Sequence, residues 1–306
     1  MQQFEPKKDA KDIQKSICKP VELNKLINII VSRSNSQRQL ILYSYENLYK
    51  SSLINDVKSL VTTNFFKLFI ALFHTSVDYD CYQLREAVAG FGTDRDTLIE
   101  ILATRSNVRI MDIKRRYPEL NDGKELAKEI EGNTSGNLRS ILLKLLECGR
   151  PINDSLDVTE CQNCAKNLYE AEKKKKGFEQ EIINMFTEKS KKEFVCITQI
   201  YYKIYGKTIL EAVEHLFSGD VKKVFKTIIY ALLSPSEYFA YRINKAIKGF
   251  LTNNNVLIRT LVSRDEIDIG RIKKYYKQLF KKDLYTEINE NFQGDYRNLL
   301  LALIGK

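Results

Sequence analysis

One pattern recurs four times along this chain of 306 residues. Each copy has an apolar pair, two further apolar positions at helical spacing and then a basic residue, which is in turn Arg33, Arg105, Lys189 and Arg264. Twelve residues after the basic residue, every copy has a tyrosine: Tyr45, Tyr117, Tyr201 and Tyr276. A repeat of about 70 residues is too small to bury its own apolar side chains, so we expect the four copies to pack together.

Each repeat is predicted to contain about five short helices. In the second repeat, apolar residues recur at i, i+3, i+4 and i+7, and the predicted helices cover 79–90, 94–104, 107–117, 122–131 and 135–148. Pro118 and the segment 121-NDG-123 are expected to interrupt the helix between the third and fourth of these. The chain has only 13 glycines and 5 prolines and shows no strand pattern of useful length. We therefore expect an all-α fold.

The spacing of the copies gives the domain boundaries. The predicted repeats cover 1–75, 76–150, 151–234 with a preceding linker, and 235–306. The interval between the second and third tyrosines is longer because it contains 148-CGRPINDSLDVTE-160, which is rich in residues typical of loops. This segment is interpreted as a linker between two pairs of repeats.

The composition limits the classes of function that the chain could have. The net charge is +10, which favours an anionic partner such as a phospholipid surface or nucleic acid, although it also suits plain solubility. No apolar stretch approaches the roughly 20 residues of a membrane span, no signal peptide is recognisable, and six scattered cysteines suggest a reduced, cytoplasmic protein. No catalytic constellation and no nucleic-acid motif is found, so we expect neither an enzyme nor nucleic-acid binding.

The repeats resemble those of a known family. A unit that reads GxGTD, LIxIL, (T/S)RS, a tyrosine and (T/S)GD(F/Y)xxLLLAL looks like an annexin repeat, and the likeness extends from about Phe4 to Ile304. The lysine- and asparagine-rich composition, together with the incomplete calcium motifs described below, also suits a divergent protist annexin of the alpha-giardin type. The resemblance implies a curved disc of four five-helix repeats. Its convex face carries the loop between the first and second helices and the loop between the fourth and fifth helices, where Ca²⁺ bridges to acidic phospholipid.

Carried onto the second repeat, this resemblance names a calcium site. Three backbone carbonyls would come from Val88, Gly90 and Gly92, but the position of the usual carboxylate holds Asn133. Because an amide offers one neutral oxygen where a carboxylate offers two charged ones, we expect weak binding. A secondary ion is conceivable at Thr93, Asp94 and Asp96. The alternative is a simple tight turn in which Thr93 or Asp94 caps the next helix.

The other repeats keep fewer of the residues expected for a calcium site. In the fourth, the equivalent set is Ile247, Gly249, Leu251 and Asn291, so one glycine is lost as well. In the first and third, the acid positions hold Leu60 and Leu216, and a leucine cannot bind a metal. We expect no calcium of this type in those two repeats.

Lysines could replace the lost calcium. Four consecutive lysines, Lys173, Lys174, Lys175 and Lys176, fall in the first loop of the third repeat, and Lys19 and Lys248 fall in the corresponding loops of the first and fourth. They are either a solvated charge run at a helix end or direct contacts to lipid phosphate. Phe91 and Phe250 in the same loops could enter lipid headgroups or pack against the protein.

The predicted function is peripheral binding of acidic phospholipid membranes at the inner face of the plasma membrane. Calcium bound weakly, chiefly in the second repeat, would supply part of the binding, and lysine contacts would supply the rest. The alternative is a structural scaffold that associates with cytoskeletal protein and whose calcium sites are relics.

Overall fold

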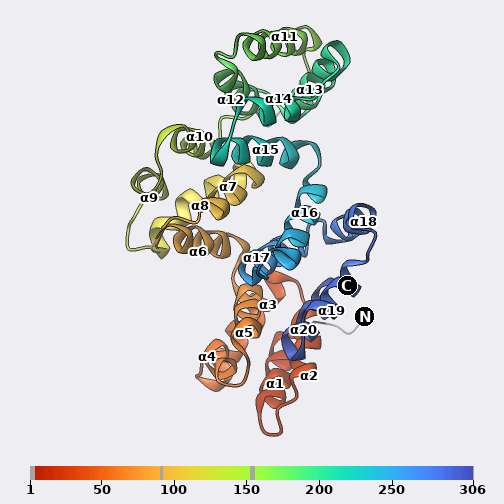
Figure 1. Ribbon diagram of the computed structural model, residues 1–306. Coiled ribbons are helices and arrows are strands. Elements are labelled where there is room, and N and C mark those ends of the chain that lie inside the picture. The colour runs from red at the N-terminus through yellow and green to blue at the C-terminus, as the bar shows by residue number, and fades with distance from the viewer. Residues whose placement is uncertain (1–3, 90–91, 152–155, 306) are drawn as a thin grey trace. The chain divides into compact units, whose positions relative to one another are not determined.

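The computed structural model describes residues 4–89, 92–151 and 156–305, and within these residues the chain forms twenty α-helices and no strand (Figure 1). The first repeat comprises α1 (Pro6–Ile17), α2 (Leu23–Val31), α3 (Asn35–Tyr49), α4 (Leu53–Lys58) and α5 (Thr63–Phe73). The second comprises α6 (Ser76–Ala89), α7 (Arg95–Thr104), α8 (Asn107–Leu120), α9 (Leu126–Asn133) and α10 (Gly136–Leu146). The third comprises α11 (Val158–Lys174), α12 (Phe178–Glu188), α13 (Lys191–Tyr205), α14 (Ile209–Leu216) and α15 (Gly219–Leu233). The fourth comprises α16 (Pro235–Lys248), α17 (Asn254–Arg264), α18 (Ile269–Phe280), α19 (Leu284–Asn291) and α20 (Gly294–Ile304).

The all-α prediction is confirmed, and the helix boundaries differ from it mainly around one proline. Pro118 lies inside α8, which continues to Leu120. The turn at Asn121–Gly123 then separates the helices, and α9 begins only at Leu126. None of the described helices is both long and apolar enough to cross a lipid bilayer.

The repeats associate in a different pairing from the one predicted. One compact unit contains residues 1–79 and 236–306, and the other contains residues 80–235. In the first unit α2 contacts α20 and α5 contacts α17, so the first repeat packs on the fourth. In the second unit α7 contacts α15 and α10 contacts α12, so the second repeat packs on the third (Figure 1). The interpretation of the linker as a divider between pairs was therefore wrong, and residues 152–155 within it lie outside the described part.

The repeated tyrosine and basic residue are structural. The tyrosines Tyr45, Tyr117, Tyr201 and Tyr276 are all buried. Arg33 Nε lies 2.6 Å from Asp9 Oδ2, and Arg105 Nη2 lies 2.8 Å from Asp80 Oδ1, so each arginine joins the second helix of its repeat to the first.

The fourth repeat replaces this ion pair with a different contact. Its first helix holds Phe239 near the basic residue, and the Arg264 guanidinium lies 4.6 Å from the centre of that ring. Arg264 Nε also donates to Asp268 Oδ1 at 2.7 Å. The position thus remains cationic in each repeat although its partner changes.

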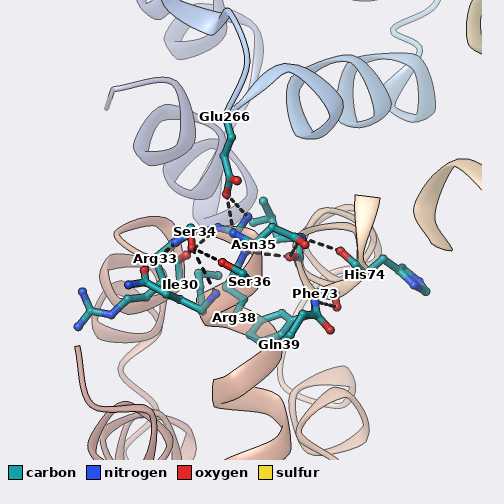
Figure 2. A network of polar contacts seen from close by, with 12 residues as sticks. Ile30, Arg33, Ser34, Asn35, Ser36, Arg38, Gln39, Phe73, His74 and Glu266 are labelled. Atoms are coloured by element: carbon teal, nitrogen blue, oxygen red, sulfur yellow. Dashed lines mark hydrogen bonds and ion pairs between the residues drawn. The ribbon is translucent and has the colours of Figure 1, made fainter. Parts of the chain in front are cut away.

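A buried arginine completes the ends of two helices in the first repeat (Figure 2). Arg38 donates to the carbonyl oxygens of Leu72 and Ile30, at 2.8 and 3.1 Å, near the ends of α5 and α2, where carbonyl groups lack a partner within the helix. Its Nη2 also lies 3.5 Å from Glu266 Oε1 of the fourth repeat, and the amide of Asn35 donates to the same carboxylate. Burial lowers the pKa of the Arg38 guanidinium, while Asp265 and Glu266 oppose that effect. The network therefore ties the first repeat to the fourth.

Candidate calcium and lipid-contact loops

In the second repeat the two loops expected to hold calcium lie together. The loop after α6 and the end of α9 are joined by a hydrogen bond from Thr93 Oγ1 to the carbonyl oxygen of Asn133, at 2.9 Å. Forty residues of sequence separate these two groups. The predicted ligand Gly90 and its neighbour Phe91 lie outside the described residues, so the site rests on Val88, Gly92 and Asn133.

The backbone of this loop leaves carbonyl oxygens available. The Asp94 amide donates to the Ala87 carbonyl at 2.8 Å and closes the loop, while the Val88 side chain is buried. Within the described part of the chain, the carbonyls of Val88 and Gly92 accept no hydrogen bond. Gly92 has φ of 93°, a left-handed conformation that a residue with a Cβ adopts only under strain. The loop therefore depends on this glycine.

The orientation of Asn133 is fixed by its own helix. Its Nδ2 donates to the carbonyl oxygen of Glu129 at 2.8 Å. Its Oδ1 accepts no hydrogen bond from the residues that the structure describes. A single neutral oxygen is thus left for a cation, where a carboxylate would give two charged ones.

The three residues named for a secondary ion have other roles. Asp94 caps α7, because its Oδ1 accepts from the Thr97 amide at 3.0 Å and its Oδ2 accepts from Thr97 Oγ1 at 2.6 Å. Asp96 forms an ion pair with Lys223 of α15. Thr93 supplies the hydrogen bond to Asn133 described above. Both carboxylates are therefore engaged by the protein, and of the two caps considered from the sequence it is Asp94 that caps.

The fourth repeat keeps the same loop closure with different residues. The Asn253 amide donates to the Ala246 carbonyl at 2.8 Å, and Asn253 Oδ1 caps α17 by accepting from the Val256 amide. Leu251 stands where the second repeat has Gly92, and it lacks the left-handed φ of that glycine. A Cβ on Gly249 would lie 2.8 Å from the Lys245 carbonyl oxygen, so a glycine is required there for close approach of the backbone.

The side chain of Asn291 is oriented by its own helix, as that of Asn133 is, but a charged residue lies beside it. Its Nδ2 donates to the carbonyl oxygen of Glu287 at 2.7 Å and to Glu287 Oε1 at 2.5 Å. Lys248 Nζ lies 2.7 Å from the same Oε1, and Lys282 Nζ lies 3.5 Å from Oε2. The predicted lipid contact Lys248 is therefore half-exposed and paired with a buried carboxylate.

Glu287 belongs to no motif that the sequence revealed. Burial works against its charged form, but the hydrogen bonds and charges of Lys248 and Lys282 outweigh burial and hold the pKa of the Glu287 carboxyl below its ordinary value. Its place one helical turn before Asn291 is the only signal that could have indicated it. An ammonium group thus lies close to the residues that would hold calcium in the fourth repeat.

The tip of the fourth-repeat loop is apolar and projects into solvent. The exposed fraction is 102% for Phe250 and 79% for Leu251, the two largest values among the exposed large hydrophobic side chains. Of the two possibilities raised for Phe250, packing against the protein is therefore not what this structure has. A fully solvated phenylalanine at a loop tip is a typical means of contacting an apolar surface.

The lysines of the third repeat are all exposed. The helix α11 ends at Lys174, and Lys175 follows in a left-handed conformation with φ of 52°. Lys173 Nζ lies 5.9 Å from the centre of the Tyr169 ring, and Lys174 Nζ lies 3.9 Å from the Glu170 carboxylate. Among the described residues, Lys175 and Lys176 have no ion-pair partner.

The first repeat presents no carboxylate at the equivalent positions. Leu60 is half-buried against the core of its unit, and Lys19 in the first loop is exposed. Among the described residues, no group of three or more histidine, cysteine, aspartate or glutamate side chains is arranged to hold a metal. A calcium ion in this chain would therefore depend chiefly on backbone carbonyls.

Known proteins resemble the chain along its whole length. The model of the family described as Annexin matches residues 8–72, 79–145, 163–228 and 238–303. Human annexin A13 is 35% identical over 306 residues, which cover 99% of this chain and 96% of that protein. Human annexin A11 is 34% identical over 304 residues, and the chain spans 60% of its length. The structure of annexin III superimposes with a TM-score of 0.94 at 31% identity, over 100% of this chain and 95% of the other.

The narrower likeness to the alpha-giardins concerns the fold alone. Calcium-bound alpha-14 giardin has a TM-score of 0.87 over 98% of this chain and 99% of that chain, but its sequence is 20% identical. The annexins named above are therefore the more similar proteins in sequence.

Proposed function

Because the chain belongs to the annexin family, we propose that it binds the surface of acidic phospholipid membranes. The contacts are the loops between the first and second helices of its second, third and fourth repeats. Annexins are generally non-enzymatic proteins that bind phospholipid in a calcium-dependent way. In this chain, weakly bound calcium supplies part of the attraction and direct lysine contacts supply the rest. The proposed place of action is the inner face of the plasma membrane.

The observation that carries this proposal is the exposure of Lys173, Lys174, Lys175 and Lys176 at the end of α11. This loop is equivalent to the glycine-rich loop of the second repeat, where calcium would present positive charge to a lipid phosphate. Near an anionic bilayer each lysine contributes about 1 kcal/mol. The four side chains therefore suffice for measurable attraction without a metal.

The calcium-dependent part is proposed for two sites of unequal strength. In the second repeat the carbonyls of Val88 and Gly92, with Gly90 between them, would bind the ion together with Asn133 Oδ1. In the fourth repeat, the set of Ile247, Gly249, Leu251 and Asn291 is weaker, because Lys248 brings a competing positive charge close to it. A secondary ion at Thr93, Asp94 and Asp96 would have to displace a helix cap and an ion pair, so it is the weakest of the three.

An apolar contact adds to the charges. Phe250 and Leu251 are exposed at the tip of the fourth-repeat loop, two and three residues beyond the half-exposed Lys248. An aromatic ring next to a lysine suits the boundary between headgroups and acyl chains. We therefore propose that this tip enters the membrane interface.

A scaffold function is favoured by a separate observation. The helix α13 exposes Tyr202 and Ile204, and α8 exposes Val108 and Met111, each with an exposed fraction between 49% and 59%. Exposed apolar side chains on helices suit a protein partner such as a cytoskeletal filament. This function would not require the loops.

Co-sedimentation with vesicles tests the proposal. The protein should sediment with phosphatidylserine vesicles in chelator, and more of it should sediment when millimolar Ca²⁺ is added. Absence of binding in both conditions, together with co-sedimentation with filaments, would replace membrane binding with the scaffold function.

A further inference from the structure

Three cysteine side chains gather where α11 packs on α13 in the third repeat. Cys161 and Cys164 lie one helical turn apart near the start of α11, and Cys196 lies in the first half of α13. The buried Cys161 thiol donates to the carbonyl oxygen of Glu193, with 3.8 Å between Sγ and O. Because Glu193 and Cys196 are three residues apart, they share one face of α13, and this face meets Cys161.

The thiols of Cys161 and Cys196 interact although they belong to different helices. Burial and a hydrogen bond with the Cys196 thiol raise the pKa of the Cys161 thiol to about 12, and Cys164 influences it least among the neighbouring groups that raise it. Cys164 has another partner, because its thiol donates to Glu160 Oε1 at 3.7 Å, and Lys189 Nζ lies 2.8 Å from the same oxygen. Cys161 and Cys196 are therefore the pair that the packing of the helices brings together.

The two helices are also held together farther along their lengths. The rings of Tyr169 and Tyr205 stack with their centroids 3.7 Å apart and an interplanar angle of 3°. The hydroxyl of Tyr201 on α13 donates to the buried carboxylate of Glu172 on α11. A bond between the two sulfur atoms would thus join helices that already pack against each other in the folded protein.

We infer that Cys161 and Cys196 form a reversible disulfide when hydrogen peroxide oxidises the protein. Cys196 reacts first, since it is half-buried whereas only 1% of Cys161 is exposed. Its thiolate attacks one oxygen of the peroxide, the O–O bond breaks, and the departing hydroxide takes up the thiol proton and becomes water. The Cys161 sulfur then attacks the sulfenic sulfur, the S–O bond breaks, and the hydroxyl leaves with the Cys161 proton as a second water. Two thiols thus lose two electrons, and one peroxide becomes two waters.

The second repeat offers an internal comparison for this pair. Its buried Cys81 also lies on the first helix of the repeat and donates to a carbonyl oxygen of the third helix, that of Ile113, at 3.8 Å. The helix α8 contains no cysteine, so Cys81 should remain a thiol under conditions that link Cys161 to Cys196. The inference concerns the packing of α11 on α13 and does not depend on the proposed membrane function.

The first experiment treats the full chain with hydrogen peroxide, alkylates the remaining thiols in denaturant and identifies linked peptides by mass spectrometry. The peptides of Cys161 and Cys196 should be recovered as one linked pair, which dithiothreitol separates, while Cys81 should be alkylated throughout. A disulfide between Cys161 and Cys164 instead, or alkylation of both Cys161 and Cys196 after oxidation, would overturn the inference. The experiment needs no variant, so it does not depend on whether a substituted chain folds.

The second experiment compares the melting temperatures of peroxide-treated and dithiothreitol-treated protein. Oxidation should raise that of the wild type by about 4–8 °C, because a disulfide restricts the unfolded chain. Cys196→Ser should abolish the increase, and Cys164→Ser, which removes the neighbouring thiol, should keep it. An increase of the same size in Cys196→Ser, or none in the wild type, would contradict a disulfide that stabilises the packing of α11 on α13.

Discussion

The loop between α6 and α7 of the second repeat and the loop between α11 and α12 of the third lie at equivalent places in two copies of one fold, but they differ in the source of the positive charge proposed for them. In the second repeat, Gly92 turns the backbone so that carbonyl oxygens stay available for a metal, and Asn133 lies beside them. In the third repeat, exposed lysines follow the helix and Leu216 stands at the acid position. On the proposed function, the second repeat obtains its positive charge from bound calcium, whereas the third repeat carries positive charge on its own lysine side chains.

The fourth repeat lies between these two cases. It keeps the asparagine and the loop closure of the second repeat, but Lys248 has its ammonium close to the metal position, paired with Glu287. Its tip exposes Phe250, for which an apolar contact with the membrane is proposed. On this proposal, loss of a calcium ligand does not by itself mean loss of membrane contact.

The largest expected effect comes from the lysine loop. Changing Lys173–Lys176 to glutamine should weaken binding to phosphatidylserine vesicles in chelator by about 100-fold or more, since each lysine contributes about 1 kcal/mol near an anionic surface. The measurement is vesicle co-sedimentation at low salt. As a control, glutamine at Lys7, Lys8, Lys11 and Lys274 changes the net charge equally at other exposed positions. Equal losses in both variants would mean that only net charge matters.

A carboxylate introduced into the second repeat should strengthen its calcium binding, and so increase its difference from the third repeat. Asn133→Asp should lower the calcium concentration for half-maximal vesicle binding by about tenfold, because a charged ligand replaces a neutral amide. Asn291→Asp should gain less, since the new carboxylate would lie next to that of Glu287. A larger gain in the fourth repeat than in the second would contradict the ranking of the two sites.

The apolar tip should contribute less than the lysines. Phe250→Ser should weaken vesicle binding by about three- to tenfold, since a partly inserted phenylalanine recovers only part of the roughly 1.5–3 kcal/mol of full burial. The free energy of unfolding should not change, because this side chain is fully solvated in the protein. A loss of stability without a loss of binding would show that Phe250 packs against the protein in solution.

The last expected effect concerns stability rather than binding, and it involves Glu287 and pH. The pKa of its carboxyl is held below 4.5, so its stabilising ion pairs are fully present above that pH and are lost as the pH falls through the lowered value. Glu287→Gln should lower the melting temperature by several degrees between pH 5 and 7, for a loss of about 1–2 kcal/mol. The difference from the wild type should begin to shrink below pH 4.5 and close only below the lowered pKa of the Glu287 carboxyl. A difference that persists in acid would mean that the charge of Glu287 is not what stabilises the loop.

Much of this fold can be predicted from the sequence, because the helical period of the apolar residues is the same in all four copies. The end of α8 could not be predicted, since the helix continues two residues beyond Pro118 before it stops. The pairing of repeats was also missed, because a linker shows where the chain is irregular but not which apolar faces meet. Contacts such as those of α2 with α20 and of α7 with α15 reveal the units.

The geometry of the candidate site was predictable where it follows the backbone and unpredictable where it depends on side-chain partners. The register of Val88, Gly92 and Asn133 could be counted along the repeat, and the structure brings Thr93 to Asn133. In contrast, the pairing of Lys248 with Glu287 depends on how helices distant in sequence approach each other.

The central claim is that calcium and the lysine loop attract the membrane independently, and one titration tests it most directly. Binding of the variant with glutamine at Lys173–Lys176 to phosphatidylserine vesicles is followed from chelator to millimolar Ca²⁺, beside the wild type. We predict that the variant does not bind in chelator and that calcium restores its binding, while the wild type binds throughout. If the two proteins give the same calcium curve, or if calcium cannot restore binding to the variant, the membrane contact does not have two independent parts.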